Sequence, residues 1–285
     1  MRTITEIAFF TGLKLVAVGS AVAPAWAADL AGSADKVELD GAEENQSEGF
    51  HGFVVLGGGA EPDYEGATEY AAMPFFFAEL TAYGVGLEIK GPEASLNLRP
   101  DAAFQFGPSI GYDMGRDGTA NKVVDRLETI DGAFEVGGFA TYQFNALLAQ
   151  SDMLEISAEL MADVSGVHEG VSGSIGVSYM VAATERLRLG LDTSVGLASD
   201  GYMDTYFGVT GKGSRQSGLA AYSASGGVKD VSLGATASFN LTERWGIVGR
   251  AQYSRLLGDA ADSPIVKQEG SADQFSGGLG ISYSF

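Results

Sequence analysis

From residue 49 to the C-terminus, apolar and polar side chains alternate along the chain. In the last strand-like stretch, one parity carries Phe275, Leu279, Ile281, Tyr283 and Phe285, and the other carries serine and glycine. A β-strand sends alternate side chains to opposite faces. The pattern therefore predicts a strand with one apolar, aromatic face and one small, polar face.

The same alternation predicts about twelve strands, which together have the length needed to cross a bilayer at a tilt. The clearest are 85–90, 104–113, 134–144, 154–164, 175–181, 187–197, 231–239, 245–254 and 275–285. The segments 50–58, 72–80 and 94–99 are weaker predictions, because Pro74 and the run Phe75–Phe77 blur the alternation.

The connections between these strands alternate in length. Short turns are expected near 81–84, 99–102, 145–153, 182–186 and 241–244. Longer connections, most of them rich in glycine, serine and charge, are expected near 59–71, 114–132, 199–229 and 258–274. Short periplasmic turns and longer external loops are typical of outer-membrane barrels, in which polar side chains face the lumen.

A soluble β-sandwich would also alternate, but it need not alternate short and long connections. No apolar run of about 18 residues follows the N-terminal region, so a spanning helix is not expected. Closing the sheet also removes exposed strand edges. We therefore predict an all-β fold, a closed antiparallel transmembrane β-barrel of about twelve strands.

The N-terminal region predicts export. Residues 1–27 resemble a signal peptide, with positive charge at Arg2 and Lys14, an apolar stretch, and Ala25-Trp26-Ala27 as a cleavage pattern. The alternative, a membrane anchor, fits less well because the apolar stretch is short. Residues 28–48 are acidic and read as a disordered periplasmic leader. Residues 49–285 form the barrel, which places the protein in the outer-membrane lipid.

Composition narrows the function. The net charge is −20, which argues against a nucleic-acid partner. There is no cysteine, and the only histidines are His51, in the first strand, and His168, at an expected loop tip. No serine-centred signature accompanies either histidine, so we predict no enzyme activity, no cofactor and no metal site.

Charged residues also occur on the predicted lumen face. They are Glu88, Glu135, Glu155, Glu159, Asp163, Arg188, Asp192 and Arg250. Buried charges must be paired or hydrated. Two interpretations remain open, a ladder of salt bridges that plugs the barrel and a polar pore with a bias towards cations. Twelve strands leave a narrow interior, so a wide porin is not expected.

Four loop motifs stand in order along the chain. The first contains Pro62, Tyr64 and Gly66, and the second Gly115 and Arg116. The third, in the longest loop, contains Tyr206, Phe207 and Gly208. The fourth, which precedes the last strand, contains Ser263 and Pro264. By themselves these residues predict shaped loops, with tyrosines packing over the barrel mouth and Ser263-Pro264 starting a turn. The ordered set, ahead of a terminal Tyr-Ser-Phe, resembles the MipA/OmpV family (MltA-interacting protein) of outer-membrane proteins.

This resemblance implies an outer-membrane barrel that acts as a scaffold for a murein hydrolase and a murein synthase. A narrow channel and a surface adhesin are the alternatives. The aromatic C-terminus resembles that of outer-membrane proteins in general. This resemblance implies that Tyr283 and Phe285 form an assembly signal that the barrel-assembly machinery recognises. The last strand is then expected to pair with the first, near 50–58, and to close the barrel.

Overall fold

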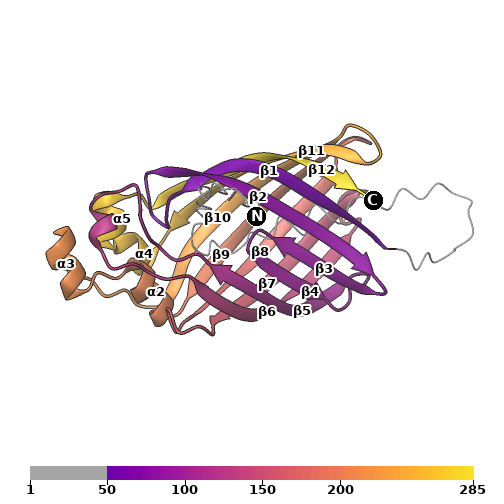
Figure 1. Ribbon diagram of the computed structural model, residues 1–285. Helices are drawn as coiled ribbons and strands as arrows, with labels where there is room; N and C mark the ends of the chain where they lie inside the picture. Colours follow the sequence, from indigo (N-terminus) through magenta and orange to yellow (C-terminus); the bar gives the residue numbers. More distant parts are fainter. Residues whose placement is uncertain (1–49) are drawn as a thin grey trace, which may run out of the picture.

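A computed structural model describes residues 50–285, so the predicted signal peptide and acidic leader lie outside the described residues. The described chain forms a closed barrel of antiparallel strands in which each strand pairs with its sequence neighbours and β1 pairs with β12 (Figure 1). The strands are β1 (His51–Pro62), β2 (Tyr70–Ala82), β3 (Val85–Lys90), β4 (Glu93–Asn97), β5 (Phe104–Asp113), β6 (Ala133–Asn145), β7 (Asp152–Asp163), β8 (Val171–Ala182), β9 (Leu187–Ala198), β10 (Gly227–Asn240), β11 (Trp245–Leu256) and β12 (Asp273–Ser284).

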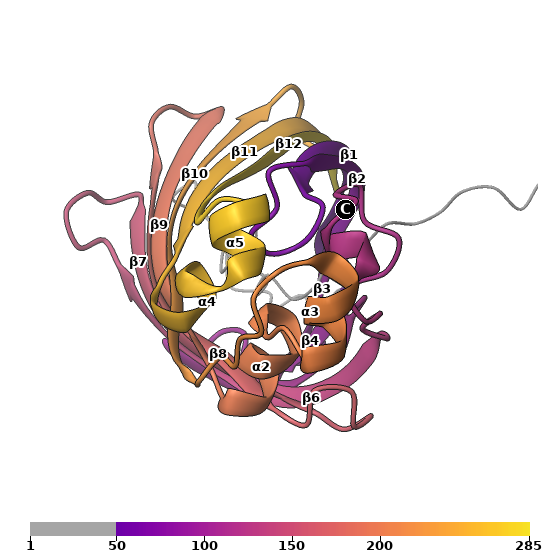
Figure 2. The same cartoon turned by 90° about the vertical axis from the view of Figure 1, so that its left-hand side faces the viewer.

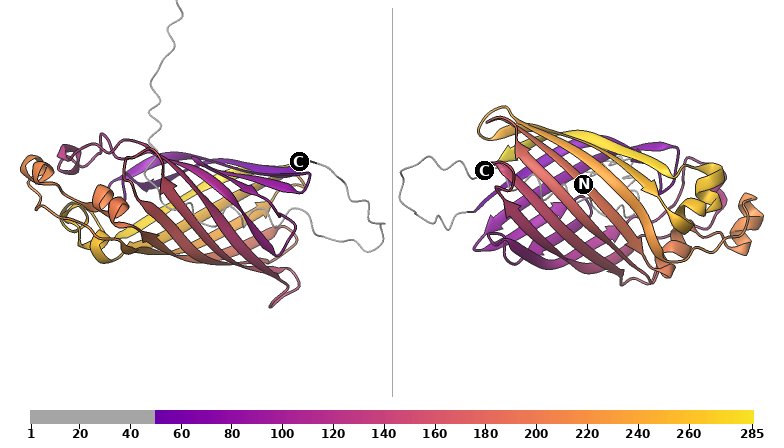
Figure 3. Two further views of the ribbon diagram at one scale, coloured as in Figure 1. Left: turned by 90° about the horizontal axis from the view of Figure 1, so that it is seen from below. Right: turned by 180° about the vertical axis from the view of Figure 1, so that it is seen from behind.

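Short and long connections gather at opposite ends of the barrel, as predicted. The short turns 83–84, 98–103, 146–151, 183–186 and 241–244 lie at the end that also holds Phe285. Long connections and all the α-helices lie at the other end, as Figure 3 also shows. Two further connections, 91–92 between β3 and β4 and 164–170 between β7 and β8, were not among those predicted. No helix within residues 50–285 is long and apolar enough to cross a membrane.

The barrel exterior is apolar. The face of β12 that carries Phe275, Leu279 and Ile281 is exposed on the outside of the barrel, as expected of a lipid-facing surface. Aromatic pairs mark both ends of this apolar belt. At the short-turn end Trp245 lies against Tyr283 at 4.7 Å between ring centroids, and at the other end Tyr112 lies against Phe134 at 4.7 Å. Such girdles are typical of outer-membrane barrels.

The blurred alternation of the first two strands has a structural cause. Phe53, Val55 and Phe77 point into the lumen and form a buried apolar cluster with Val248, and Phe75 packs against it. Residues of the opposite parity, such as Leu56 and Phe76, are exposed on the lipid side. Both faces of β1 and β2 are therefore apolar, so period-two alternation cannot mark them.

The closing seam between β1 and β12 is built on facing glycines. Gly57 pairs with Gly280, and Gly59 pairs with Gly278. The Phe75 ring packs directly on these glycines. A Cβ added at Gly278 would lie 2.8 Å from the ring, and one added at Gly280 would lie 3.0 Å from it. At the rim, Gly52 and Phe285 exchange two backbone hydrogen bonds of 3.2 and 3.0 Å. The predicted pairing of the last strand with the first is confirmed.

We predict that Gly57→Ala destabilises the barrel by about 1–3 kcal/mol, since its Cβ would overlap the Leu279 carbonyl and the Phe75 ring. Gly58→Ala is the matched control, because its Cβ faces lipid and its nearest neighbour is the Met73 carbonyl oxygen at 3.7 Å. Urea unfolding of each variant refolded into lipid vesicles measures the difference. Equal unfolding midpoints for the two variants would contradict the close packing of the Phe75 ring against Gly57.

Candidate functional site: a cap over a polar cavity

The long connections fold together into one structure over the mouth of the barrel, which we call the cap (residues 63–69, 114–132, 164–170, 199–226 and 257–272). It contains α2 (Asp200–Phe207), α3 (Gly211–Ser217), α4 (Gly258–Asp262), α5 (Pro264–Glu269) and the 3-10 turn η1 (Val124–Arg126). Seen from the helical end, these helices lie across the barrel opening (Figure 2). The loops are thus not free extensions of the strands.

Two apolar clusters hold the cap together. The larger surrounds α2 and consists of Ile130, Ala198, Tyr202, Met203, Tyr206, Phe207, Ala224, Leu256, Ala260 and Val266. The smaller consists of Tyr64, Ala67, Val124, Val209, Leu219 and Ile265. Full burial of one large apolar side chain contributes about 1.5–3 kcal/mol. Each cluster draws residues from at least three connections, so the connections stabilise one another.

Local sequence explains where the cap helices begin. Ser263 precedes α5, and its hydroxyl oxygen accepts the Ile265 N–H at 3.2 Å, while Pro264 occupies the first helical turn. Both residue types are favoured at these positions. Ser263-Pro264 therefore starts a helix, and not the simple turn that the sequence suggested. The Ser263 hydroxyl also donates to the Phe207 carbonyl at 2.6 Å and ties α5 to α2.

The four sequence motifs converge in the cap. Arg116 donates from Nη1 to the Tyr206 carbonyl at 2.8 Å, and the Tyr206 hydroxyl donates to Asp113 Oδ2 at 2.6 Å. Gly66 has a φ of +93°, and a Cβ there would lie 2.6 Å from Val266. Gly115, with a φ of +70°, approaches the Ile130 carbonyl too closely for a side chain. The expectation that the tyrosines pack over the barrel mouth is confirmed.

Burial sets the protonation of the polar groups in this part of the cap. Burial lowers the pKa of Arg116 to about 10, so the guanidinium keeps its charge at neutral pH. Burial and the adjacent Asp113 carboxylate raise the pKa of Tyr206 well above its ordinary value. The phenol therefore stays protonated and remains the donor in its bond to Asp113.

The first and last connections are joined directly across the seam. The Gly66 N–H donates to Gln274 Oε1 at 3.2 Å, and Gln274 Nε2 donates to the Ala67 carbonyl at 3.1 Å. The Ser271 N–H donates to the Gly66 carbonyl at 2.8 Å. This contact links parts of the chain about two hundred residues apart, above the β1–β12 pair.

A buried ion pair lies under the cap. Lys229, at the start of β10, contacts the Glu65 carboxylate and lies 3.2 Å from Asp230. The Tyr202 hydroxyl donates to Glu65 Oε2 at 3.1 Å. Burial raises the pKa of Glu65 above its ordinary value, although the Lys229 ammonium acts in the opposite direction. The sequence gives no sign of this pair: Glu65 lies inside the first motif, but nothing around it in the chain points to Lys229.

The structure corrects the expected position of His168. It is not at a loop tip, because only 3% of its surface is exposed and its ring packs on Tyr202 and Tyr206 at 5.2 and 5.9 Å. Its Nδ1 accepts the Gly170 N–H at 3.1 Å. The ring proton is therefore on Nε2, which lies 3.3 Å from Glu135 Oε1. His51 lies in β1, as expected.

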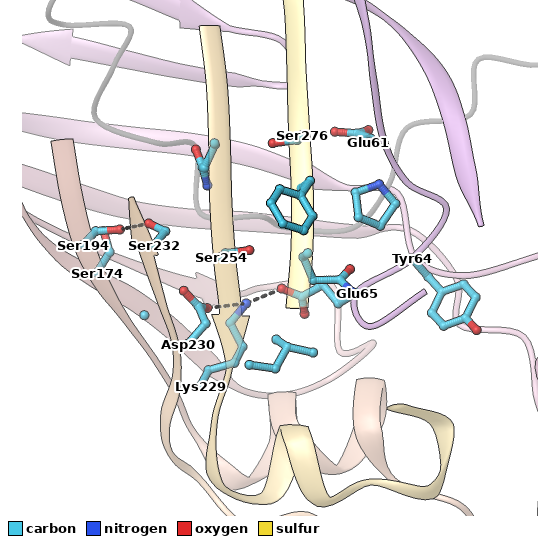
Figure 4. A pocket seen from close by; sticks show the side chains of 16 residues that line it. Glu61, Tyr64, Glu65, Ser174, Ser194, Lys229, Asp230, Ser232, Ser254 and Ser276 are labelled. Carbon is cyan, nitrogen blue, oxygen red and sulfur yellow. Dashed lines mark hydrogen bonds and ion pairs between the residues drawn. The ribbon is translucent and has the colours of Figure 1, made fainter. Parts of the chain in front are cut away.

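Below the cap is a polar cavity of about 90 Å³ (Figure 4). Its wall carries serines from five neighbouring strands, β8 to β12, namely Ser174, Ser194, Ser232, Ser254 and Ser276. Glu61, Glu65, Lys229 and Asp230 also line the cavity. One water needs about 10–15 Å³ measured in this way, so the cavity has room for several.

The predicted lumen charges do not form one continuous ladder. Arg250 binds Asp192 through two bonds of 2.6 and 2.9 Å, and Glu135 faces His168. The others form separate contacts: Glu88 with Lys90 at 2.6 Å, Glu155 with Gln143 at 3.1 Å and Glu159 with Ser109 at 3.3 Å. The Asp163 carboxylate instead accepts the backbone N–H groups of Ser165, Gly166, His168 and Glu169. Within residues 50–285, Arg188 makes no ion pair with an acidic residue.

In the part of the chain that the structure describes, no group of three or more histidine or acidic side chains is arranged to hold a metal ion. What the arrangement does offer is a mouth covered by packed helices, a small polar cavity below them, and separate ion pairs along the lumen.

The lipid-facing belt, the closed sheet and the polar interior define the class of protein as a transmembrane β-barrel of the outer membrane. The profile of the family described as "MltA-interacting protein MipA" matches residues 54–285, so the chain belongs to this family. The family resemblance predicted from the motifs is confirmed.

Two curated relatives are similar over part of the chain. The MltA-interacting protein of Escherichia coli (strain K12) is 26% identical over 164 residues, 56% of this chain and 58% of the relative. The putative outer membrane protein YiaT of Escherichia coli (strain K12) is 32% identical over 133 residues, 46% of this chain and 51% of the relative. The chain thus spans about half the length of the curated relatives it matches.

Among solved structures, an outer-membrane channel from Pseudomonas putida F1 covers 86% of this chain and 100% of its own, with a TM-score of 0.42 and 14% identity. The outer-membrane channel DcaP of Acinetobacter baumannii covers 83% and 96%, with a TM-score of 0.38 and 9% identity.

We predict that Arg116→Met loosens the cap, since it leaves the buried Tyr206 carbonyl without its donor, at a cost of about 1–3 kcal/mol. Trypsin cleavage at Lys122, Lys212 and Arg215 in the cap should accelerate roughly ten-fold, while the barrel remains folded. Arg186→Met, at an exposed short turn, is the control. Unchanged cleavage rates in Arg116→Met would mean that this contact does not hold the cap.

Proposed function

We propose that this chain is a structural, non-enzymatic barrel of the outer membrane that holds murein-processing enzymes at its periplasmic face. The observation that carries the proposal is the packed cap that covers the outer end, so that the short turns are the protein surface exposed on the periplasmic side. The name of one relative, MltA-interacting protein, supports a murein enzyme as the partner.

The β6–β7 turn (146–151) is a suitable contact for such a partner. Leu147 and Leu148 are 53% and 79% exposed at its tip. The Asp152 carboxylate accepts the N–H groups of Leu147, Leu148 and Ala149 at 2.7–2.8 Å, and the Tyr179 hydroxyl donates to it at 2.9 Å. The two leucines are therefore presented on a turn with a fixed backbone, which reduces the entropy lost on binding.

Non-enzymatic function is supported by the environment of His168. Its two ring nitrogens face the Gly170 amide and the Glu135 carboxylate, so neither is available as a base for a serine nucleophile. The cap also separates this side chain from the exterior.

Assembly is the second interaction we propose. Tyr283 and Phe285 lie at the short-turn rim, with ring centroids 6.3 Å apart, and Phe285 stacks on Phe50 at 5.2 Å. Phe285 is partly exposed. The terminal aromatic face is thus available to the barrel-assembly machinery before the strand pairs with β1.

We predict that Leu148→Asp weakens capture of a purified lytic transglycosylase from the same bacterium by about ten-fold, since loss of an apolar anchor typically costs more than 1 kcal/mol. Gln150→Asp introduces the same charge in the same turn and should leave capture unchanged. Binding is measured on the full-length barrel in nanodiscs. Equal affinities for wild type and Leu148→Asp would exclude this turn as the contact, and failure of wild type to bind would reject the scaffold function.

The alternative function, a narrow channel, would use the charged lumen and the polar cavity. The cap above and the cluster of Phe53, Val55 and Phe77 in the lumen obstruct the axial route. We therefore predict no conductance steps above those of a protein-free detergent control in planar bilayers. Reproducible steps would establish the channel instead.

A further inference from the structure

One part of the barrel wall is incomplete. The strands β3 and β4 have 6 and 5 residues, whereas the other strands have 10–14. Their hairpin ends at Gly91, whose N–H donates to the Phe76 carbonyl at 2.9 Å. Figure 1 faces this side of the barrel and shows β3 and β4 ending partway along it, whereas the opposite wall in Figure 3 continues to the helical end.

The neighbouring strands consequently lose their partners. The pairing of β2 with β3 begins at Phe77, so Tyr70–Phe75 pairs with β1 alone. The pairing of β4 with β5 ends at Ile110, so Gly111–Asp113 pairs with β6 alone. Pro74 lies in the open edge of β2. Proline lacks an N–H group and within sheets is found mainly at such edges.

This gap in the backbone pairing, which we call the opening, lies at the depth of the membrane. A strand of 6 residues rises about 20 Å along its axis, and at a tilt near 45° it covers about 14 Å of an apolar belt that is about 25 Å tall. The hairpin begins at the short-turn end, so the missing half of the wall faces the outer leaflet. Backbone at this depth is tolerated only when it is covered by protein or lines a hydrated space.

The cap frames the opening from above. The connection 114–132 leaves β5 and reaches over to the β1–β2 connection, where the Ala120 N–H donates to Asp63 Oδ2 at 2.8 Å. Asn121 Nδ2 donates to the Glu269 carbonyl at 3.1 Å. The opening therefore has four defined borders: the β2 edge, the hairpin tip, the β5 edge and this bridge.

The inner border combines apolar and acidic groups. Met73 and Phe75 face inwards from the β2 edge and are only partly buried. Phe77, two residues further along β2 on the same face, is 1% exposed. The hairpin and β7 contribute Glu88, Glu93 and Glu159 against the single ammonium of Lys90. An apolar edge next to an excess of acidic side chains suits a hydrocarbon tail that carries a positive charge.

We propose that this opening is a lateral portal between the outer leaflet and the lumen, which admits an amphiphile with a single hydrocarbon tail and a cationic head group. The tail lies against Met73 and Phe75, and the head group lies near Glu93. Addition of a β-strand from a partner fits less well, because Pro74 interrupts the ladder and the two open edges differ in length.

A dodecylamine that carries a photoactivatable diazirine in its tail is the probe, with the matching carboxylate as the comparison. The barrel in lipid nanodiscs is labelled and the modified residues are identified by mass spectrometry. We expect the amine to label Met73 and Phe75, and to label them roughly ten-fold more than the carboxylate, as for one charge-assisted contact.

Two variants test the route. Ala71→Trp places bulk at the inward-facing β2 edge and should abolish labelling of Met73, whereas Ala158→Trp on the lipid face of β7 should not. Glu93→Gln adds no bulk and should remove the preference for the amine, which keeps the test informative if Ala71→Trp does not fold. Labelling confined to outward-facing residues such as Pro74 and Phe76, or equal for both probes, would overturn the proposal.

Discussion

Backbone pairing in lipid is the constraint on which this structure depends. Each N–H and C=O group at membrane depth needs a partner, and a sheet provides partners everywhere only when its first and last strands join. Here the joint is made of Gly57, Gly59, Gly278 and Gly280, whose backbones lie close together, and of the Phe75 ring that covers them. The glycines, which have no side chains, thus leave the space that the Phe75 ring occupies on the inner side of the seam.

The cap is the second consequence of a closed wall. Closure brings five connections to one rim, and their apolar residues can then bury each other at the cost of a few fixed polar contacts. Arg116 and Ser263 both bind carbonyls of α2, at Tyr206 and Phe207 respectively. The helix α2 therefore lies at the centre of the cap, although the sequence showed only that its connection is long and carries the third motif, and predicted no helix there.

Sequence patterns identified all twelve strands because lipid imposes period two on nearly every one. The pattern was weaker where the lumen is itself apolar, at Phe53, Val55 and Phe77. It also placed His168 at a loop tip, since a histidine between Gly166 and Gly170 gives no local sign that Tyr202 and Tyr206 will cover it. The motif residues were found, but their convergence was not, because pairs such as Arg116 and Tyr206 are brought together only by the complete barrel. The pairing of Lys229 with Glu65 was hidden for the same reason.

The bond between Gly66 and Gln274 has an implication for the order of folding. It joins the first connection to the start of the last strand, directly above the seam. The two residues become neighbours only after β12 has found β1, so the cap cannot be completed on an open sheet. A chain arrested before closure would carry its external segments unpacked, with Lys212, Arg215 and Lys267 accessible to proteases. A fully packed cap is therefore found only in molecules whose first and last strands have paired.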